Sequence, residues 1–444
     1  MTRPILFSFF LSLISFELLA QGMGSKEYIL PEMVVTATKS EKGAADLPIP
    51  VTVISAKEIK AKGIVRLDQL LAEQPGLALV SDVTGQGKGI QIQGFDPAYT
   101  LVLIDGDPVI GRIAGVLDLS RISLGNAERI EYIKGPSSSL YGSDALGGVI
   151  NIITKKTPDG IRSTIALKYG SFHAADLSAD ISYKKKKLEI YQFFNRFSGS
   201  GYRVQGGSRD GFTVPPYAAY TYQTKIGYAF TEKLKANATG RIYTDAKSDE
   251  YQTTTDALTA SSGIKEFTVS PSLVYQLNGK NKFQLKSSTT RYHATDQQNR
   301  VSDQSLLQYN YFTQYLLKNE LQYDLRFSDR VKFVSGVGVQ NESVQATRYQ
   351  GLKQFQSNFA YVQADIEINK HMQLISGARY DKHNLYGDQF NPKVALAYKV
   401  ASFFKLKASV GRGYKTPDFR QLYLNFMNPA EGYRVFGVNE LSYQ

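Results

Sequence analysis

The chain has 444 residues, enough for two domains or for one domain followed by a large barrel. It contains no cysteine, which excludes a disulfide framework, an iron–sulfur site and a catalytic thiol. The 52 Lys and Arg against 40 Asp and Glu give a net charge of +12, which suits an anionic membrane surface or nucleic acid. We interpret the four lysines at 184–187 as a solvated turn, because no basic stripe extends them into a nucleic-acid site.

Residues 1–20 predict a signal peptide. Arg3 supplies the positive charge, residues 5–16 form an apolar core, and Ala20 is a small residue at a plausible cleavage point. The alternative is a membrane anchor, but the core is short for a bilayer span. The remaining chain has no apolar run of the length that a transmembrane helix needs, so any membrane span must be a β-barrel.

Residues 21–44 predict an extended segment outside the first domain. Met33 to Thr38 is an apolar, β-branched run with strand character, and its flanks are polar. An isolated strand leaves backbone N–H and C=O groups unpaired. Its partner is either a strand of another protein or a strand of the domain that follows.

Residues 45–157 predict a small α/β domain. Ser55 and Glu58 have the spacing of a capping box, so a short helix is expected to follow and to stop at Gly63. Leucines at 67, 70 and 71 predict a second helix that Pro75-Gly76 ends. Strands are expected at residues 51–54, 90–93, 101–104, 129–133 and 149–154.

An enzymatic role finds little support in the sequence. Gly85 to Gly89 could be taken for a phosphate-binding loop, but such a loop must open a helix and this one leads into the alternating Ile90 to Gln93. The four histidines are scattered and predict ordinary surface residues: His173, His293, His371 and His383. No catalytic or metal-ligating cluster stands out, so we expect neither an enzyme nor a bound cofactor or metal.

Between residues 160 and 416, within a second predicted domain at residues 158–444, the hydrophobic period becomes two. Tyr220, Tyr222 and Ile226 share an apolar face, while Thr221 and Gln223 share a polar one. Such strands suit a lipid-embedded barrel with a wet interior, or else a soluble antiparallel sheet. Short turns are expected at 231–233, 278–281, 328–330 and 369–371, and long loops near 199–217, 247–266, 296–305 and 347–356. This alternation of short and long connections is typical of outer-membrane barrels.

Four motifs in the first domain carry a family resemblance. They are Leu101 to Gly106 (LVLIDG), Arg129 to Glu131 (RIE), Lys134 to Pro136 (KGP) and Leu140 to Thr154 (LYGSDALGGVINIIT). Together with the barrel pattern, they resemble the TonB-dependent outer-membrane receptors, in particular the cobalamin-receptor-like branch. One departure is Gln93, where the family usually carries an arginine that serves contacts between plug and barrel.

The resemblance implies a small α/β plug domain, residues 45–157, followed by an antiparallel transmembrane β-barrel from residue 158. We count about thirteen strand candidates of the 22 in such a barrel, so we expect an incomplete, C-terminally truncated barrel. The resemblance further identifies a TonB box in the segment 21–44, comprising Glu32, Met33, Val34, Val35, Thr36 and Ala37. This box is expected to hang in the periplasm and to add as a strand to TonB, which the inner-membrane complex energises.

The implied activity is active import of a scarce ligand, with outer-membrane lipid around a monomeric receptor and no role for nucleic acid. Cobalamin, ferric siderophores and haem are the ligand classes of the family, and the lack of histidine in residues 45–157 counts mildly against haem. The plug positions that align with ligand-facing loops are Thr84, Gln86, Lys88, Val109 and Arg112. The alternatives are a non-functional receptor fragment and a passive porin-like channel. A signalling transducer would need a further N-terminal domain, for which there is little room.

Overall fold

The computed structural model describes residues 33–44, 47–81, 87–113, 115–204, 211–252, 256–401, 403–428 and 433–437. These residues form one compact unit, which contains the plug and a large antiparallel sheet. Within these ranges, no helix combines the length and the hydropathy that crossing a membrane would require.

The centre of the plug is a mixed five-stranded sheet. Its strands, in spatial order, are β3 (Val51–Ser55), β10 (Ala127–Lys134), β11 (Gly148–Thr154), β6 (Thr100–Ile104) and β7 (Asp107–Pro108). Strands β11 and β6 pair in parallel, and the other neighbours are antiparallel. The near-continuous apolar sequences of β6 and β11 fit strands that are covered on both faces. The predicted strands at 51–54, 101–104, 129–133 and 149–154 are therefore confirmed.

Two short helices cover this sheet. Helix α2 (Ala56–Lys62) begins after Ser55, whose side chain accepts a hydrogen bond of 3.2 Å from the Glu58 N–H, as the capping pattern predicted. It ends at Gly63, which adopts a φ of 69°. Helix α3 (Leu67–Ala72) places its three leucines in the core of the plug.

Smaller elements complete the plug. The hairpin of β4 (Leu77–Ser81) and β5 (Lys88–Ile92) confirms that a strand, not a helix, follows the glycine-rich stretch, so the phosphate-loop interpretation fails. The other elements are β1 (Met33–Val34), β2 (Lys42–Gly43), η2 (Pro97–Tyr99), β8 (Arg112–Ile113), β9 (Val116–Leu117), η3 (Leu119–Arg121), α4 (Ser138–Tyr141) and η4 (Ser143–Ala145).

The second half of the chain forms a single sheet of thirteen strands, β12 to β24, in which each strand pairs antiparallel with its neighbours in sequence. The strands are β12 (Gly160–Tyr169), β13 (Ala175–Lys185), β14 (Leu188–Gly199), β15 (Tyr217–Ala229), β16 (Leu234–Gln252), β17 (Ala257–Asn278), β18 (Asn281–Arg300), β19 (Leu306–Arg326), β20 (Val331–Ala346), β21 (Lys353–Asn369), β22 (Met372–His383), β23 (Gly387–Ala401) and β24 (Phe404–Gly411). Strands β12 and β24 do not pair with each other, so the sheet is not closed into a barrel.

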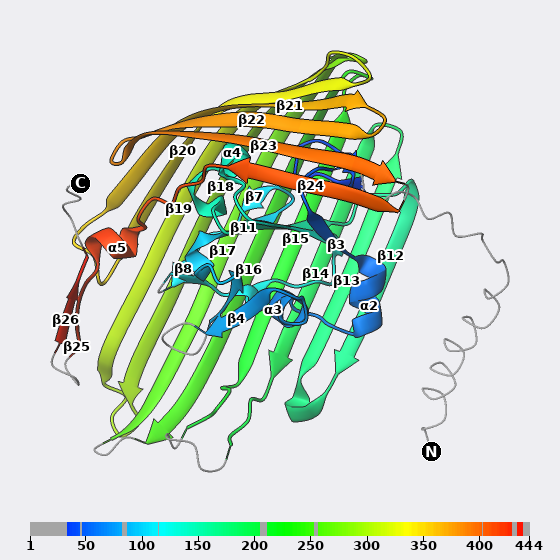
Figure 1. Cartoon of the computed structure of the whole chain (residues 1–444). Coiled ribbons are helices and arrows are strands. Elements are labelled where there is room, and N and C mark those ends of the chain that lie inside the picture. The colour runs from blue at the N-terminus through cyan, green and yellow to red at the C-terminus, as the bar shows by residue number, and fades with distance from the viewer. Residues whose placement is uncertain are drawn as a thin grey trace, which may run out of the picture. The chain divides into compact units, whose positions relative to one another are not determined.

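The two faces of this sheet differ as the alternation predicted. On β15, Tyr222 is 40% exposed on the outer face, whereas the neighbouring Gln223 is 1% exposed on the inner face. On β23, Val394 and Tyr398 are exposed and Ala395 and Ala397 are buried. Figure 1 shows the plug elements within the curve of the sheet, and the polar inner face therefore meets the plug.

The short turns lie where they were expected, but most of the long loops are shorter than predicted. The connection 200–216 between β14 and β15 is long, as expected. The loops predicted at 247–266, 296–305 and 347–356 are wrong in extent, because β16, β17, β18 and β21 extend into them. Polar strands that extend beyond the apolar band keep their ladder hydrogen bonds, although their sequences resemble loops.

After β24 the chain runs back across the plug. Lys415 Nζ lies 2.8 Å from Asp144 Oδ1, and Thr416 Oγ1 donates to Ser143 Oγ at 3.2 Å. The remaining elements are η5 (Ser171–His173), α5 (Phe419–Tyr423), β25 (Asn425–Asn428) and β26 (Tyr433–Phe436). Residues 412–418 thus fasten one apex of the plug.

Candidate functional site

Three residues of the predicted box are buried in the molecule. We call residues 33–37 the box segment; Glu32 lies outside the described residues. Met33 and Val34 pair antiparallel with Gly43 and Lys42, and Val34, Thr36 and Ala37 are buried. The expectation of a segment that hangs free is therefore wrong for this state. The segment is too apolar to stay in water when a matching surface of the plug and sheet is available.

Thr36 is the polar centre of this docking site. Its N–H and its hydroxyl both donate to Glu131 Oε2, at 2.8 Å and 2.6 Å. Its hydroxyl oxygen accepts from Asn151 Nδ2 at 3.1 Å, and its carbonyl accepts from the Tyr141 hydroxyl at 2.8 Å. All polar groups of a fully buried residue are thus paired, as burial demands.

Glu131 is held by a second set of contacts from the plug itself. It lies on β10 with no exposed surface, and Arg129 Nε donates to its Oε1 at 2.7 Å. Val35 adds a backbone N–H bond to Oε2 at 2.9 Å. A buried carboxylate with a cation and several donors around it is stable, whereas the same carboxylate without them is costly.

Lysines after the box segment tie it to the sheet. Lys39 Nζ lies 2.6 Å from Glu320 Oε1 on β19 and 4.1 Å from the centre of the Tyr361 ring. Lys42 forms an ion pair with Asp365 on β21. Burial lowers the pKa of Lys39 to about 7, although the Glu320 carboxylate acts in the opposite direction.

The predicted ligand residues do not gather around one site. Thr84 and Gln86 lie outside the described residues. Lys88 begins β5, with its Nζ 3.9 Å from Asp68 Oδ2. Val109 is buried in the plug core, where it has a packing role.

Arg112, the last of these predicted residues, is engaged within the plug. Its guanidinium donates to the carbonyls of Pro97 at 3.0 Å and Thr100 at 2.6 Å. In this state it supports the loop rather than facing an open space. The adjacent Gly111 N–H donates to Gln314 Oε1 on β19 at 2.9 Å, which attaches this loop to the wall.

Two arginine contacts between plug and sheet come from residues that the sequence analysis did not single out. Gln93, at the position where arginine is usual, is exposed with a φ of 50°. Arg66 instead donates to Asp176 Oδ2 at 3.1 Å and to Asn195 Oδ1 at 3.0 Å.

A second arginine of the plug is also engaged with the sheet. Arg121 Nη1 lies 3.4 Å from Glu266 Oε2. Neither Arg66, just before α3, nor Arg121, at the end of η3, is marked in the sequence as a contact to the sheet, because the partners of both arginines are distant along the chain.

The inner wall contributes cations of its own. Lys225 Nζ lies 2.9 Å from Asp105 Oδ2, and Lys286 Nζ lies 2.8 Å from Asp107 Oδ1. Asp105 lies in the β6–β7 turn, at the end of the LVLIDG motif, and Asp107 begins β7 directly after the motif. The end of the motif is thus bound to the wall by two lysines.

No group of three or more His, Asp or Glu side chains among the described residues could hold a metal ion.

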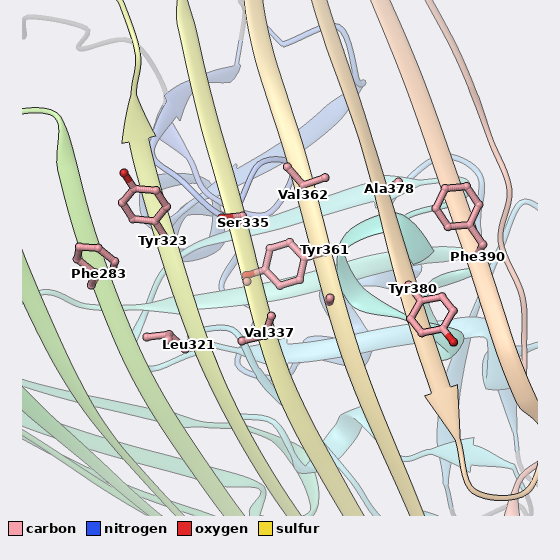
Figure 2. A pocket seen from close by; sticks show the side chains of 12 residues that line it. Phe283, Leu321, Tyr323, Ser335, Val337, Tyr361, Val362, Ala378, Tyr380 and Phe390 are labelled. Carbon is pink, nitrogen blue, oxygen red and sulfur yellow. The ribbon is translucent and has the colours of Figure 1, made fainter.

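The apolar groove in Figure 2 lies on the outer face of the sheet, across β18 to β23, with a volume of about 410 Å³. The Tyr361 ring packs against Gly336, where a Cβ would lie 2.5 Å from Tyr361 Cζ. The groove is lined by Phe283, Leu321, Tyr323, Ser335, Gly336, Val337, Ala360, Tyr361, Val362, Ala378, Tyr380 and Phe390. It faces away from the plug, so we assign it to the membrane-facing surface.

A plug docked against the polar face of a long antiparallel sheet, whose outer face is apolar, defines a plugged membrane receptor. Residues 44–149 match the family model for the TonB-dependent receptor plug domain, and residues 190–442 match the TonB-dependent receptor-like β-barrel. The chain belongs to the TonB-dependent receptors.

Similar proteins agree with this assignment. The chain is 28% identical to the vitamin B12 transporter BtuB of Photobacterium profundum, over 88% of this chain and 63% of that protein. BtuB of Vibrio cholerae is also 28% identical, over 88% of this chain and 64% of that protein. The chain therefore spans somewhat less than two thirds of the length of these relatives.

Solved structures share the fold. The siderophore receptor PirA of Acinetobacter baumannii aligns with a TM-score of 0.71 at 18% identity, over 88% of this chain and 66% of that one. The ferric enterobactin receptor PfeA of Pseudomonas aeruginosa aligns with a TM-score of 0.68 at 17% identity, over 84% of this chain and 63% of that one.

Proposed function

We propose that this protein takes part in TonB-dependent import of a scarce ligand across the outer membrane of a Gram-negative bacterium. The observation that carries the proposal is the box segment, which joins the plug through one polar cluster and is followed by two ion pairs to the sheet. Passive diffusion through a channel would require neither a plug bound to the wall nor such a segment. The β-branched sequence of the segment suits strand addition to a partner sheet.

Cobalamin is the first ligand to test. The sequence relatives at 28% identity are named vitamin B12 transporters, whereas the siderophore receptors resemble this chain in fold at 17% to 18% identity. We expect the ligand to contact the plug at residues 84–88 and 109–112, because these positions align with ligand-facing loops of the family. Ferric siderophores and haem are the other candidates.

The test of the partner uses Val34→Pro. Proline removes a backbone donor and fixes φ, so the box segment could no longer add as a strand to TonB. We expect cells that depend on this receptor to lose uptake of labelled ligand, while binding of that ligand at the cell surface is retained. Uptake at the unaltered rate would show that the segment is not the TonB box.

The test of the ligand is a titration of outer membranes that carry the protein with cyanocobalamin, a ferric catecholate siderophore and haem in parallel. Saturable binding of cyanocobalamin alone supports cobalamin. Binding of another of the three would reassign the ligand. The absence of binding by all three would favour the non-functional alternative.

A further inference from the structure

The box segment cannot bind a partner sheet while it is docked. The Thr36 N–H is engaged by Glu131 and the Thr36 carbonyl by Tyr141. Val34 is paired with Lys42. The backbone groups that a partner strand would need are therefore occupied, and release must come before binding.

We propose that Glu131, together with Asn151 and Tyr141, forms a release latch on Thr36 that sets how often the box segment undocks. This inference rests on the proposed function, because it names what controls access to the TonB box. Glu131 is a positioning residue in this scheme. It holds the segment in place and touches neither ligand nor TonB.

The hydrogen bonds of Glu131 show why it holds the segment. Its carboxylate accepts bonds from Arg129, from Val35 and, twice, from Thr36. Most of these donors come from the box segment. Hydrogen bonds to an ionised group are about twice as strong as neutral ones. The Glu131 carboxylate also has no exposed surface, and hydrogen bonds are stronger in such a site than in water.

The same arrangement explains why release is feasible. When the segment leaves, Glu131 keeps the Arg129 guanidinium at 2.7 Å, and the vacated space admits water. The carboxylate is therefore never left without a counter-charge, which would be the costly outcome. The latch can open without unfolding β10.

Asn151 connects the latch to the wall. Its Nδ2 donates to the Thr36 hydroxyl oxygen, and its Oδ1 accepts from the Gly106 N–H at 3.2 Å. Gly106 lies in the β6–β7 turn, whose carboxylates are bound by Lys225 and Lys286. A shift of this turn would remove a partner of Asn151 and weaken the latch on Thr36.

The test measures undocking directly with a thiol probe. The chain has no cysteine, so Val34→Cys introduces a single thiol at a position that is fully buried when docked. The rate of maleimide labelling then reports exposure of the segment in the purified protein. In this background we expect Glu131→Gln and Thr36→Val each to raise the labelling rate at least tenfold, and Tyr141→Phe to raise it less.

The matched control is Glu128→Gln. Glu128 lies on the same strand and pairs with the same Arg129, at 3.7 Å, but does not contact the box segment. Its labelling rate should stay within twofold of the parent. Thr36→Val keeps the shape of the side chain and leaves the plug sheet untouched, so the test survives even if Glu131→Gln fails to fold.

A second readout separates the latch from the function it rests on. Binding of the isolated TonB C-terminal domain should rise in the variants that label faster. Unchanged labelling in Thr36→Val would overturn the latch. Faster labelling without any gain in TonB binding would support the latch and overturn the assignment of the segment as a TonB box.

Discussion

Replacing Gly111 by alanine should loosen the plug loop that contacts the wall. Gly111 has a φ of +88°, and a Cβ built on it would lie 2.4 Å from two ring carbons of Tyr292. Tyr292 is buried, with Phe312 at 6.2 Å and the Arg121 guanidinium at 5.0 Å from its ring centre. The ring therefore has little room to move aside.

The magnitude follows from two separate costs. A left-handed backbone costs an alanine about 1 to 2 kcal/mol, and overpacking adds about 1 to 3 kcal/mol. We expect a total of about 3 kcal/mol, which corresponds to roughly a hundredfold faster hydrogen exchange of the amides that depend on this loop. The assay is native-state hydrogen exchange of the purified protein, followed at the backbone amides of residues 109 and 111.

Gly135→Ala is the matched control for the backbone cost. Gly135 has a φ of +89°, but a Cβ there would have no neighbour within 4 Å. Gly135→Ala should therefore be destabilised only by the left-handed backbone, by about 1 to 2 kcal/mol. A double variant, Gly111→Ala with Tyr292→Ala, should show a coupling of about 2 kcal/mol because the clash is gone. Equal effects of Gly111→Ala and Gly135→Ala would refute the steric argument.

Two further predictions concern charged contacts of the plug. Arg379→Met should cost about 3 to 5 kcal/mol in urea unfolding, because it removes the cation that Asp381 meets inside the sheet and the donor to the Leu140 carbonyl; Arg379→Met with Asp381→Leu should recover most of that loss. Burial raises the pKa of Asp144, but the Lys415 and Arg112 cations outweigh it and leave the pKa at about 2. Because that value lies below the ordinary 3.8, the pair with Lys415 should be fully stabilising above pH 4 and lost as the pH falls through 2. Hydrogen exchange of residues 412–418 at a series of pH values checks this, and Asp144→Asn should abolish the dependence.

Local patterns predicted much of the fold. The alternation of Tyr222 with Gln223 needs only the strand period of two, so the faces of the sheet were evident before any partner strand was known. The cap at Ser55 and the stop at Gly63 are likewise properties of a few consecutive residues. The lengths of the loops were predicted less well, because polar residues beyond the apolar band can continue the hydrogen bonding between strands.

The family motifs located the box segment but not its docked state. Thr36 and Glu131 are 95 residues apart in sequence, and Lys39 and Glu320 are 281 apart. No spacing rule links such pairs, and a polar residue such as Glu131 looks in sequence like an exposed strand position. Likewise, Arg112 aligned with a ligand loop, whereas folding directs its guanidinium to the carbonyls of Pro97 and Thr100.

The sequence by itself therefore determined the order of plug and sheet and the two faces of each strand, and it suggested the segment that we propose as the TonB box. Only the tertiary structure decided that this segment is buried, which carboxylate receives it and which cations hold the plug to the wall. Periodicity and capping arise from neighbouring residues, so they can be read along the chain. The pairing of a buried charge is set by whichever donors the fold brings within about 3 Å of it.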